Sequence, residues 1–152
     1  MYENEILRDQ FTTFGVNFNP NVVLTLTTHK SWNAAKMNKL VSQFFGRLDR
    51  KLLGNAWLEM PTKERIDGIA FVEKPNVKVH AHCCVRLNVN RWYETLRASI
   101  HIWKQLCPSG AVHFEPISYP RPAVDYCLKE TERDDYKFED QIILLGVFHP
   151  QP

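Results

Sequence analysis

Residues 78–87, with the sequence KVHAHCCVRL, form the stretch that decides how this chain folds. Side chains along a β-strand point alternately to its two faces, so every second residue shares a face. One face of this stretch carries only apolar residues: Val79, Ala81, Cys83, Val85 and Leu87. The other face carries Lys78, His80, His82, Cys84 and Arg86. The pattern predicts a strand that buries its apolar face under helices and presents two histidines together on the opposite face.

The flanking sequence predicts further strands and three helices. Short apolar or β-branched runs predict strands at residues 22–28 (VVLTLTT), 57–60, 68–73, 111–117 and 142–147. Apolar residues at helical spacing predict a long helix over residues 33–53, which Gly54 ends. A short helix is expected over residues 123–132. Another helix is expected to begin at an Asn90 cap and to bury Tyr93, Leu96, Ile100, Trp103 and Cys107.

Consecutive strands separated by hairpin-length gaps favour an antiparallel sheet. We therefore predict an α+β fold, with a central antiparallel sheet flanked by helices that pack mainly on one face. A length of 152 residues, 44% of them hydrophobic, predicts a single domain over residues 1–152. No apolar run is long enough to cross a membrane, and the N-terminal MYENEILRDQ lacks the apolar core of a signal peptide. We expect a cytoplasmic or nuclear protein without a membrane partner.

Charge is distributed unevenly along the chain. Residues 130–140 (ETERDDYKFED) hold six acidic and two basic side chains, whereas the remaining residues hold 17 basic and 11 acidic ones. A basic body favours a polyanion as the partner, and no role is predicted for the acidic segment. The four cysteines contain no CxxC pair, which argues against a structural zinc site and favours a reducing compartment.

The two histidines suit a catalytic metal site. The rise of ~3.3 Å per residue places the Cβ atoms of His80 and His82 roughly 6–7 Å apart, close enough to share one ion. If Glu73 pairs opposite Lys78 in a hairpin, its carboxylate lies on the same face, although a turn one residue longer or shorter would reverse it. Glu59, on the predicted preceding strand, is the alternative third ligand. Two surface histidines on a solvated sheet face are the simpler interpretation of the same pattern.

A second motif lies in the predicted short helix, within AVDYCLKE. Tyr126 and Lys129 are three residues apart and so share a helix face. A phenol has a pKa of about 10 and is a poor nucleophile, but a nearby ammonium favours the phenolate. Tyrosine, lysine and a metal-polarised phosphate together would make a phosphoryl-transfer site. The alternative is a half-buried aromatic beside a solvated cation.

The order of these motifs resembles that of the HUH endonucleases, and specifically of the replication-initiator (Rep) class of rolling-circle elements. The strand VVLTLTT is similar to their first motif, His80-Ala81-His82 to the His-hydrophobe-His motif, and Tyr126 to Lys129 to the Tyr-x-x-Lys motif. The resemblance covers roughly residues 20–132. The helix holds one candidate tyrosine, as in one-tyrosine members. Single-domain transposases of the same superfamily share the histidine-first order and remain the alternative.

The resemblance implies a metal-dependent enzyme that nicks and rejoins single-stranded DNA to initiate and terminate rolling-circle replication. It implies Mn²⁺ or Mg²⁺ held by Glu73, His80 and His82, with Mn²⁺ better suited to imidazole ligands. It further implies a 5′-phosphotyrosine intermediate on Tyr126, assisted by Lys129. Single-stranded DNA is the expected partner. The chain shows no helicase domain of the kind that many viral Rep proteins append, so it is expected to be a small initiator, a transposase-like relative or an excised domain. A host helicase is the second expected partner.

Backbone contacts to DNA are expected from Lys63, Arg65, Lys78 and Arg86. His113 and Glu115 share one face of their strand and either approach the site or face solvent. Two other functions remain open. A non-catalytic nucleic-acid-binding module would bind without metal, although such modules usually present paired aromatics on the central strands. A metal-dependent hydrolase would use water in place of the tyrosine.

Overall fold

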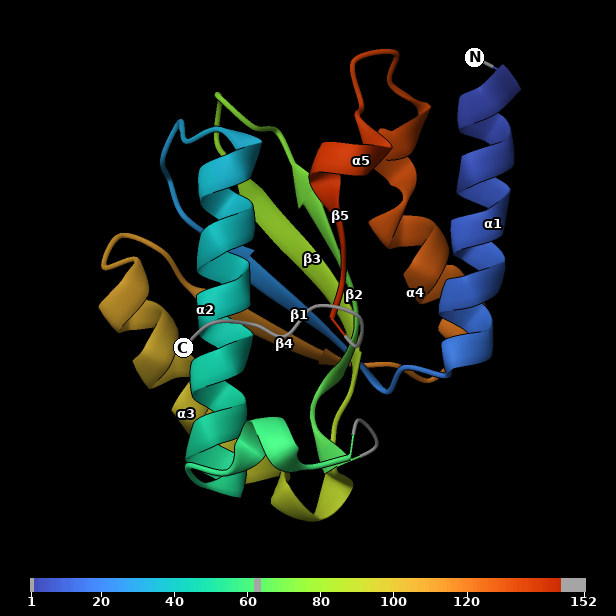
Figure 1. Cartoon of the computed structure of the whole chain (residues 1–152). Helices are drawn as coiled ribbons and strands as arrows, with labels where there is room; N and C mark the ends of the chain where they lie inside the picture. Colours follow the sequence, from blue (N-terminus) through green and yellow to red (C-terminus); the bar gives the residue numbers. More distant parts are fainter. Residues whose placement is uncertain (1, 62–63, 146–152) are drawn as a thin grey trace.

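The computed structural model describes residues 2–61 and 64–145, and it consists of a five-stranded antiparallel sheet with helices on both faces (Figure 1). The sheet has the order β4-β1-β3-β2-β5, so the histidine strand is central. The strands are β1 (Val22–Thr27), β2 (Asp67–Glu73), β3 (His80–Arg86), β4 (Val112–Pro116) and β5 (Ile142–Leu144). The α-helices are α1 (Tyr2–Phe18), α2 (Ala34–Leu53), α3 (Trp92–Leu106), α4 (Pro120–Cys127) and α5 (Phe138–Gln141). The predicted α+β fold with a flanked antiparallel sheet is confirmed.

The predicted alternation along β3 is confirmed and organises the main core. All odd-numbered residues from 79 to 87 are buried, in one apolar cluster with residues of α2 and α3. At the start of α2, the Asn33 Oδ1 accepts a hydrogen bond from the Lys36 backbone N–H at 2.9 Å. Gly54 ends α2 with a φ of 89°, a left-handed conformation that favours glycine. The even-numbered residues of β3 lie on the opposite face.

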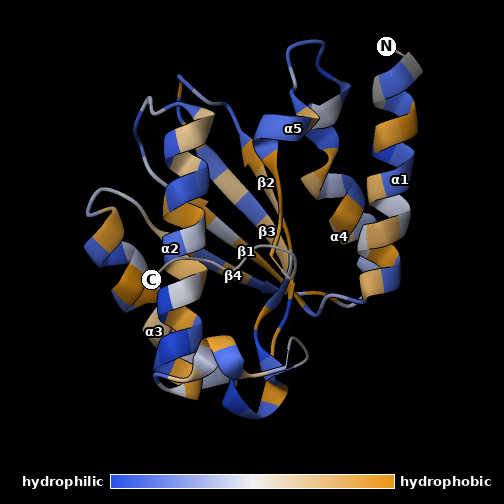
Figure 2. Ribbon diagram, viewed as in Figure 1, coloured by the Kyte–Doolittle hydropathy of each residue, from blue (hydrophilic) through white to orange (hydrophobic). Residues whose placement is uncertain are grey.

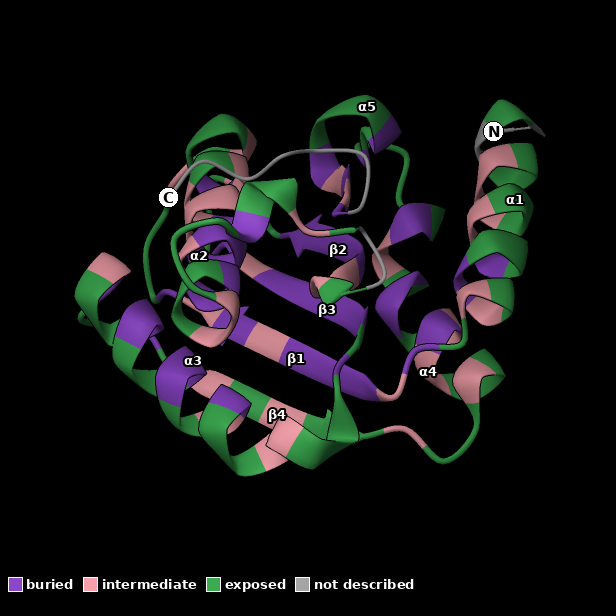
Figure 3. Ribbon diagram, turned by 60° about the horizontal axis from the view of Figure 1, so that its bottom comes forward, coloured by how far each residue is buried: buried purple, intermediate pink, exposed green. Residues whose placement is uncertain are grey.

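That opposite face is also covered by helices, so the expectation of helices mainly on one face is wrong. Helices α1 and α4 and the 3-10 helix η4 (Lys129–Glu132) lie on this side, whereas α5 contacts both β2 and α2 at the end of the sheet (Figures 1 and 3). A second apolar cluster there includes Cys84, Val124, Cys127 and Leu128. Figure 3 shows β2 and β1 largely buried between the two helical layers, whereas β4 forms an exposed edge.

The sequence patterns predict no element before residue 22, where the structure has helix α1. Its buried positions include Thr12 and Gly15, which are small or polar, while Ile6 and Phe14 are exposed. Hydrophobic and hydrophilic residues therefore alternate along α1 without a continuous apolar stripe (Figure 2). Gly15 packs so closely on α4 that an added Cβ would lie 2.9 Å from the Val124 Cγ1 atom. The close packing of two helices thus depends on a missing side chain.

Three predicted elements differ in the structure. Residues 57–60 do not form a strand: Trp57–Glu59 is a 3-10 helix, η1, in which the Glu59 N–H donates to the Ala56 carbonyl oxygen at 3.0 Å. The predicted helix 123–132 is divided, because α4 ends at Cys127 and η4 begins at Lys129. The last strand ends at Leu144, and the predicted residues 146–147 lie outside the described residues.

Helix α3 buries only part of the predicted apolar stripe: Trp103 and Cys107 are buried as predicted, whereas Tyr93 and Ile100 are not. Its cap is not Asn90; the Asn88 side chain accepts from the Asn90 N–H in the preceding 3-10 helix η3 (Val89–Arg91). Tyr93 is 81% exposed and Ile100 51% exposed. The buried residues of α3 are Thr95, Ala98, Ser99, Ile102 and Trp103. Small residues let α3 pack closely against its neighbours, and small residues carry little hydrophobic signal in a sequence.

None of the described helices is both long enough and apolar enough to cross a membrane.

Candidate metal centre and its neighbouring tyrosine

The hairpin between β2 and β3 brings Glu73 onto the histidine face. Glu73 lies directly opposite His80 and not opposite Lys78, so the predicted register is wrong by two residues. A shift of two residues preserves the face, because side chains alternate with a period of two. The turn is two residues longer than predicted, and the segment before α2 binds it: the Asn76 N–H donates to the Trp32 carbonyl oxygen at 2.8 Å.

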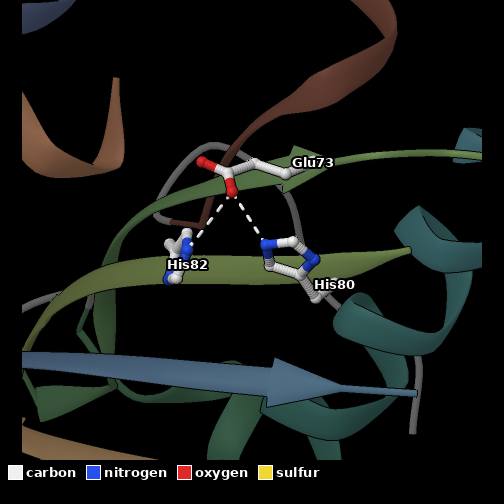
Figure 4. Close-up of side chains that lie close together, drawn as sticks. All are labelled: Glu73, His80 and His82. Carbon is white, nitrogen blue, oxygen red and sulfur yellow. Dashed lines mark hydrogen bonds and ion pairs between the residues drawn. The ribbon is translucent and has the colours of Figure 1, made fainter. Parts of the chain in front are cut away.

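One carboxylate oxygen of Glu73 faces both imidazole rings (Figure 4). The Glu73 Oε2 atom lies 2.7 Å from the His80 Nε2 atom and 3.3 Å from the His82 Nε2 atom. The candidate ligand atoms of the three residues all lie within 4.8 Å of one another. Two imidazole nitrogens and one carboxylate oxygen suit a divalent transition metal and leave positions open for other ligands. The group is a candidate metal site with the three predicted ligands.

Hydrogen bonds behind both imidazoles orient them for this role. The His80 Nδ1 atom lies 3.1 Å from the Lys78 carbonyl oxygen, and this oxygen can only accept. The Nδ1 atom is therefore the donor in this contact, and the Nε2 atom is the nitrogen that faces Glu73 and would bind a metal. The His82 Nδ1 atom lies 2.9 Å from the Thr25 Oγ1 atom. Thr25 stands opposite His82 in the sheet, and it was not predicted because strand pairing cannot be read from residue patterns alone.

The carboxylate is buried but stays charged. Glu73 is 1% exposed, and His82 is 6% exposed. Burial raises the pKa of Glu73, but hydrogen bonds from His80 and His82 and the charge of Lys129 outweigh burial and lower it to about 2. A buried anion therefore stands ready at neutral pH, held by groups that favour its charged form.

The ammonium of Lys129 lies inside this cluster. Its Nζ atom is 3.3 Å from each Glu73 carboxylate oxygen and 3.4 Å from the His82 Nε2 atom. The same Nζ atom lies 4.1 Å from the centre of the Tyr126 ring. Lys129 thus contacts two of the three predicted metal ligands, Glu73 and His82, and the predicted nucleophile, although it lies in η4 and not on the helix of Tyr126.

Tyr126 lies beside the candidate metal ligands and is open to solvent. Its ring centre is 5.3 Å from that of His82, and the side chain is 54% exposed. Tyr126 belongs to the last turn of α4, whose buried side holds the helix on the sheet. There the Cys127 Sγ atom lies 3.2 Å from the Cys84 Sγ atom of β3. The hydrogen bond to Cys84 and burial raise the pKa of the Cys127 thiol, so this pair is a neutral packing contact.

Two of the four predicted DNA-contacting residues lie on or beside this face. Lys78 has an exposed side chain next to His80, whereas Arg86 lies at the far end of β3. The Arg86 guanidinium is held by α1: its Nη1 atom donates to the Phe18 carbonyl oxygen at 3.3 Å, and the group stacks 4.7 Å from the Phe18 ring. Lys78 is therefore placed near the candidate ligands, and Arg86 is placed as a contact to the end of α1.

The remaining predicted residues lie elsewhere. Arg65 interacts electrostatically with Asp49 of α2, on the other side of the sheet. Lys63 lies outside the described residues. Glu59, the alternative metal ligand, is exposed in η1, so the prediction that it lies on a neighbouring strand is wrong.

The acidic segment 130–140 turns its aromatic residues inward. Tyr136 and Phe138 are 5% and 6% exposed, and their rings contact each other. Phe138 also stacks on Phe11 of α1 with ring centres 5.9 Å apart. The acidic side chains from residue 132 onward are exposed, whereas that of Glu130 is only 16% exposed, and α5 of this segment packs on β2, the strand that carries Glu73.

On the open side of the site, a row of side chains leads to the sheet edge. His82, Thr25 and His113 are paired across β3, β1 and β4, so all three point to the same face. His113 and its neighbour Glu115 are exposed. Of the two alternatives for His113, the structure favours an exposed position on the face of the candidate metal site.

Comparison with protein-family models, with curated protein sequences and with solved structures gave no significant match.

Proposed function

We propose that this protein is an HUH-type endonuclease that nicks and rejoins single-stranded DNA through Tyr126. The observation that carries the proposal is the arrangement of Tyr126 and Lys129 around a buried set of two histidines and one carboxylate. Separate elements supply these groups, and the order of motifs along the chain is that of Rep proteins. We further propose that the reaction serves to start and end rolling-circle replication, with single-strand transposition as the alternative role.

Glu73, His80 and His82 would hold the metal, which would draw charge from a non-bridging oxygen of the scissile phosphate. Mn²⁺ and Mg²⁺ both suit this chemistry, and the two imidazoles favour Mn²⁺. The donor set fits the ion: Glu73 is ionised, and the hydrogen bond from His80 to the Lys78 carbonyl oxygen selects the Nε2 atom as ligand. The Thr25 hydroxyl contacts the His82 Nδ1 atom and so orients this ring with its Nε2 atom toward Glu73.

Tyr126 is the proposed nucleophile. Its oxygen forms a bond to phosphorus while the bond between phosphorus and the 3′ oxygen breaks, and the leaving oxygen takes up a proton to become a 3′-hydroxyl. The product is a phosphodiester between Tyr126 and the 5′ end. One diester replaces another, so a second 3′-hydroxyl can reverse the step and join strands. The exposure of Tyr126 suits a substrate as large as a nucleic acid strand.

Lys129 is proposed to change partners during the reaction. Its ammonium now neutralises Glu73, which is the charge that a bound metal would also neutralise. Once Glu73 is engaged, the partly exposed Lys129 side chain can turn to the phosphate or to the developing phenolate of Tyr126. Its position over the Tyr126 ring keeps it within reach of both.

The DNA strand is proposed to follow the row from His82 to His113 at the sheet edge. Lys78 remains the proposed backbone contact among the predicted basic residues, because its side chain is exposed beside His80. Arg86 is less suited, since its guanidinium already binds the end of α1.

The direct test is formation of a covalent adduct. The protein is incubated with Mn²⁺ and a panel of hairpin-bearing single-stranded oligonucleotides labelled at the 3′ end, and the products are separated on a denaturing gel. We expect a labelled band at the mass of protein plus oligonucleotide fragment. The Tyr126→Phe variant should give none, and Glu73→Gln should give little.

Tyr119→Phe is the matched control, because Tyr119 is also an exposed tyrosine near α4, at 76% exposure. It should form the adduct as the unchanged protein does. Cleavage that persists in Tyr126→Phe and releases free 5′-phosphate ends would instead establish a hydrolase that uses water. That second candidate is favoured by one observation: Lys129 lies over the face of the Tyr126 ring, and within the described residues no hydrogen bond to the Tyr126 oxygen is formed.

A further inference from the structure

A basic groove lies between α2 and α3, on the side of the sheet away from Glu73. Its volume is about 1040 Å³. The basic residues that line it are Arg47, Arg50 and Lys51 from α2, and Arg97 and His101 from α3. The proposed nicking reaction uses none of these residues.

The positive charge of the groove is only partly neutralised by the described part of the protein, since Glu94 interacts with Lys51. Glu94 is the one acidic residue that lines it, and the guanidinium of Arg91 already binds this carboxylate through two contacts of 3.0 and 2.7 Å. Within the described part of the chain, Arg47, Arg50 and Arg97 form no ion pair. The groove therefore presents several guanidinium groups without a counter-charge.

Helix stability alone does not explain this cluster. Arg50 and Lys51 lie in the last turn of α2, where positive charge interacts favourably with the helix dipole. Arg47 lies one turn earlier and is spaced three and four residues from those two, and like charges at such spacing repel. Arg97 lies in the middle of α3, away from either end. A bound anion shared by both helices would offset this repulsion.

Tyr93 adds an aromatic surface to the same groove. It lines the groove and is 81% exposed, although its type and position in α3 predict burial. Exposed aromatics next to cations are typical of surfaces that bind single-stranded nucleic acid, where bases stack while the backbone meets positive charge. Arginine suits the backbone because its planar guanidinium binds phosphate oxygens in pairs.

We propose that the groove between α2 and α3 binds the phosphodiester backbone of a nucleic acid strand, as a contact separate from the metal centre. The cations of α2 and α3 bind the phosphates, and Tyr93 stacks on a base of an unpaired strand. The inference needs neither metal nor nicking, so it stands independently of the proposed function.

The test measures binding of the full chain, in EDTA, to a fluorescein-labelled oligothymidine of about 30 nucleotides and to a duplex of equal length. Fluorescence anisotropy is followed over a series of salt concentrations. The groove variant is Arg47→Gln with Arg97→Gln. The matched control is Lys39→Gln with Lys104→Gln, which removes the same charge from exposed positions of the same two helices outside the groove. Thermal unfolding checks that both variants fold.

We expect the groove variant to bind about 10-fold or more weakly, with a salt slope reduced by roughly 2, and the control to bind like the unchanged protein. Tyr93→Ala should weaken binding of the single strand about 10-fold and leave the duplex unaffected. Equal losses in the groove variant and the control would overturn the proposal. Unchanged nucleic acid affinity in the groove variant would also overturn the proposal. If that variant also lost self-association, the occupant of the groove would be the acidic segment 130–140 of a second copy.

Discussion

Among the described residues, one carboxyl group is buried on each side of the central sheet, and the two groups behave in opposite ways. Asp49 lies in α2 on the side of the main core and is 3% exposed, while Glu73 lies on the other side and is 1% exposed. Burial raises the pKa of Asp49 to about 6. The pKa of Glu73 is lowered to about 2, although burial opposes the shift. Similar burial therefore leads to opposite charge behaviour, and the difference lies in the neighbours.

Asp49 has few partners for its charge. Its Oδ1 atom accepts one hydrogen bond from the Ile66 N–H at 2.9 Å, and Arg65 adds a favourable charge. Glu73 has two imidazoles and an ammonium within hydrogen-bonding distance. A carboxylate with this many cationic or polar partners is prepared to hold a cation, whereas a carboxyl group with one backbone partner connects a loop to a helix. The comparison separates a structural acid from a candidate ligand.

Replacing each of the two carboxyl groups in turn should give the largest difference in Mn²⁺ affinity. Glu73→Gln is expected to weaken Mn²⁺ binding by at least about 100-fold, because it removes the only anionic ligand of the set. Asp49→Asn should leave Mn²⁺ affinity unchanged, since it lies across the sheet. Isothermal titration calorimetry on both variants measures this difference. Equal affinity for Mn²⁺ in the unchanged protein and in Glu73→Gln would exclude the proposed metal centre.

The hydrogen bond behind His82 should have a smaller effect on the same site. Thr25→Val keeps the shape of the side chain and removes the hydroxyl that contacts the His82 Nδ1 atom at 2.9 Å. Loss of such an orienting partner is expected to weaken Mn²⁺ binding by about 10-fold. Thr27→Val is the control, since Thr27 lies on the same strand face but bonds to the backbone of Ala111. A similar change in both variants would contradict a specific role for Thr25.

The packing of α1 on α4 should affect the tyrosine but not the metal. Gly15→Ala would place a Cβ 2.9 Å from Val124 and so displace the helix that carries Tyr126. We expect the rate of adduct formation to fall by about 10-fold, because nucleophile alignment is sensitive to shifts below 1 Å. Mn²⁺ affinity should stay the same, since β2 and β3 hold the ligands. The exposed Thr13→Ala in the same helix serves as the control.

The ligand face was predictable because a strand has a period of two. His80, His82 and Glu73 were placed together from alternation and hairpin parity, and parity held even though Glu73 pairs with His80 and not with Lys78. The face on which Glu73 lies depends only on whether the spacing is odd or even, and a two-residue change in the turn leaves this parity intact. Thr25 was not predicted, because its pairing with His82 joins residues 57 positions apart.

The helical layer over that face was not predictable in the same way. Helix α1 buries Thr12 and Gly15, so its packed face lacks a strong apolar signal. Close packing of small residues depends on the partner surface, which is formed by distant parts of the chain. Tyr126 and Lys129 were identified from their spacing, but their contacts with His82 and Glu73 depend on where this layer docks.

Protonation of Asp49 gives the smallest expected effect, and it tests whether Asp49 is a structural acid whose pKa is raised by burial. Its pKa in the folded protein is about 6 against 3.8 for the free group, so the folded state binds this proton more tightly. Stability from Asp49 is therefore fully present below its unfolded pKa and is lost as pH rises through about 6. Glu73 has the opposite sign: its contribution is present above its unfolded pKa of 4.5 and is lost as pH falls towards about 2.

Of these two carboxyl groups only Asp49 titrates between about pH 5 and about pH 7, and loss of its contribution should reduce the free energy of unfolding by about 1 kcal/mol. Asp49→Asn should remove this change, because the amide oxygen still accepts from the Ile66 N–H but does not ionise. Urea unfolding in EDTA at both pH values, taken as the difference between the variant and the unchanged protein, cancels the titration of histidines elsewhere. An identical pH dependence in both proteins would mean that Asp49 is ionised throughout, and that its neighbours stabilise charge as those of Glu73 do.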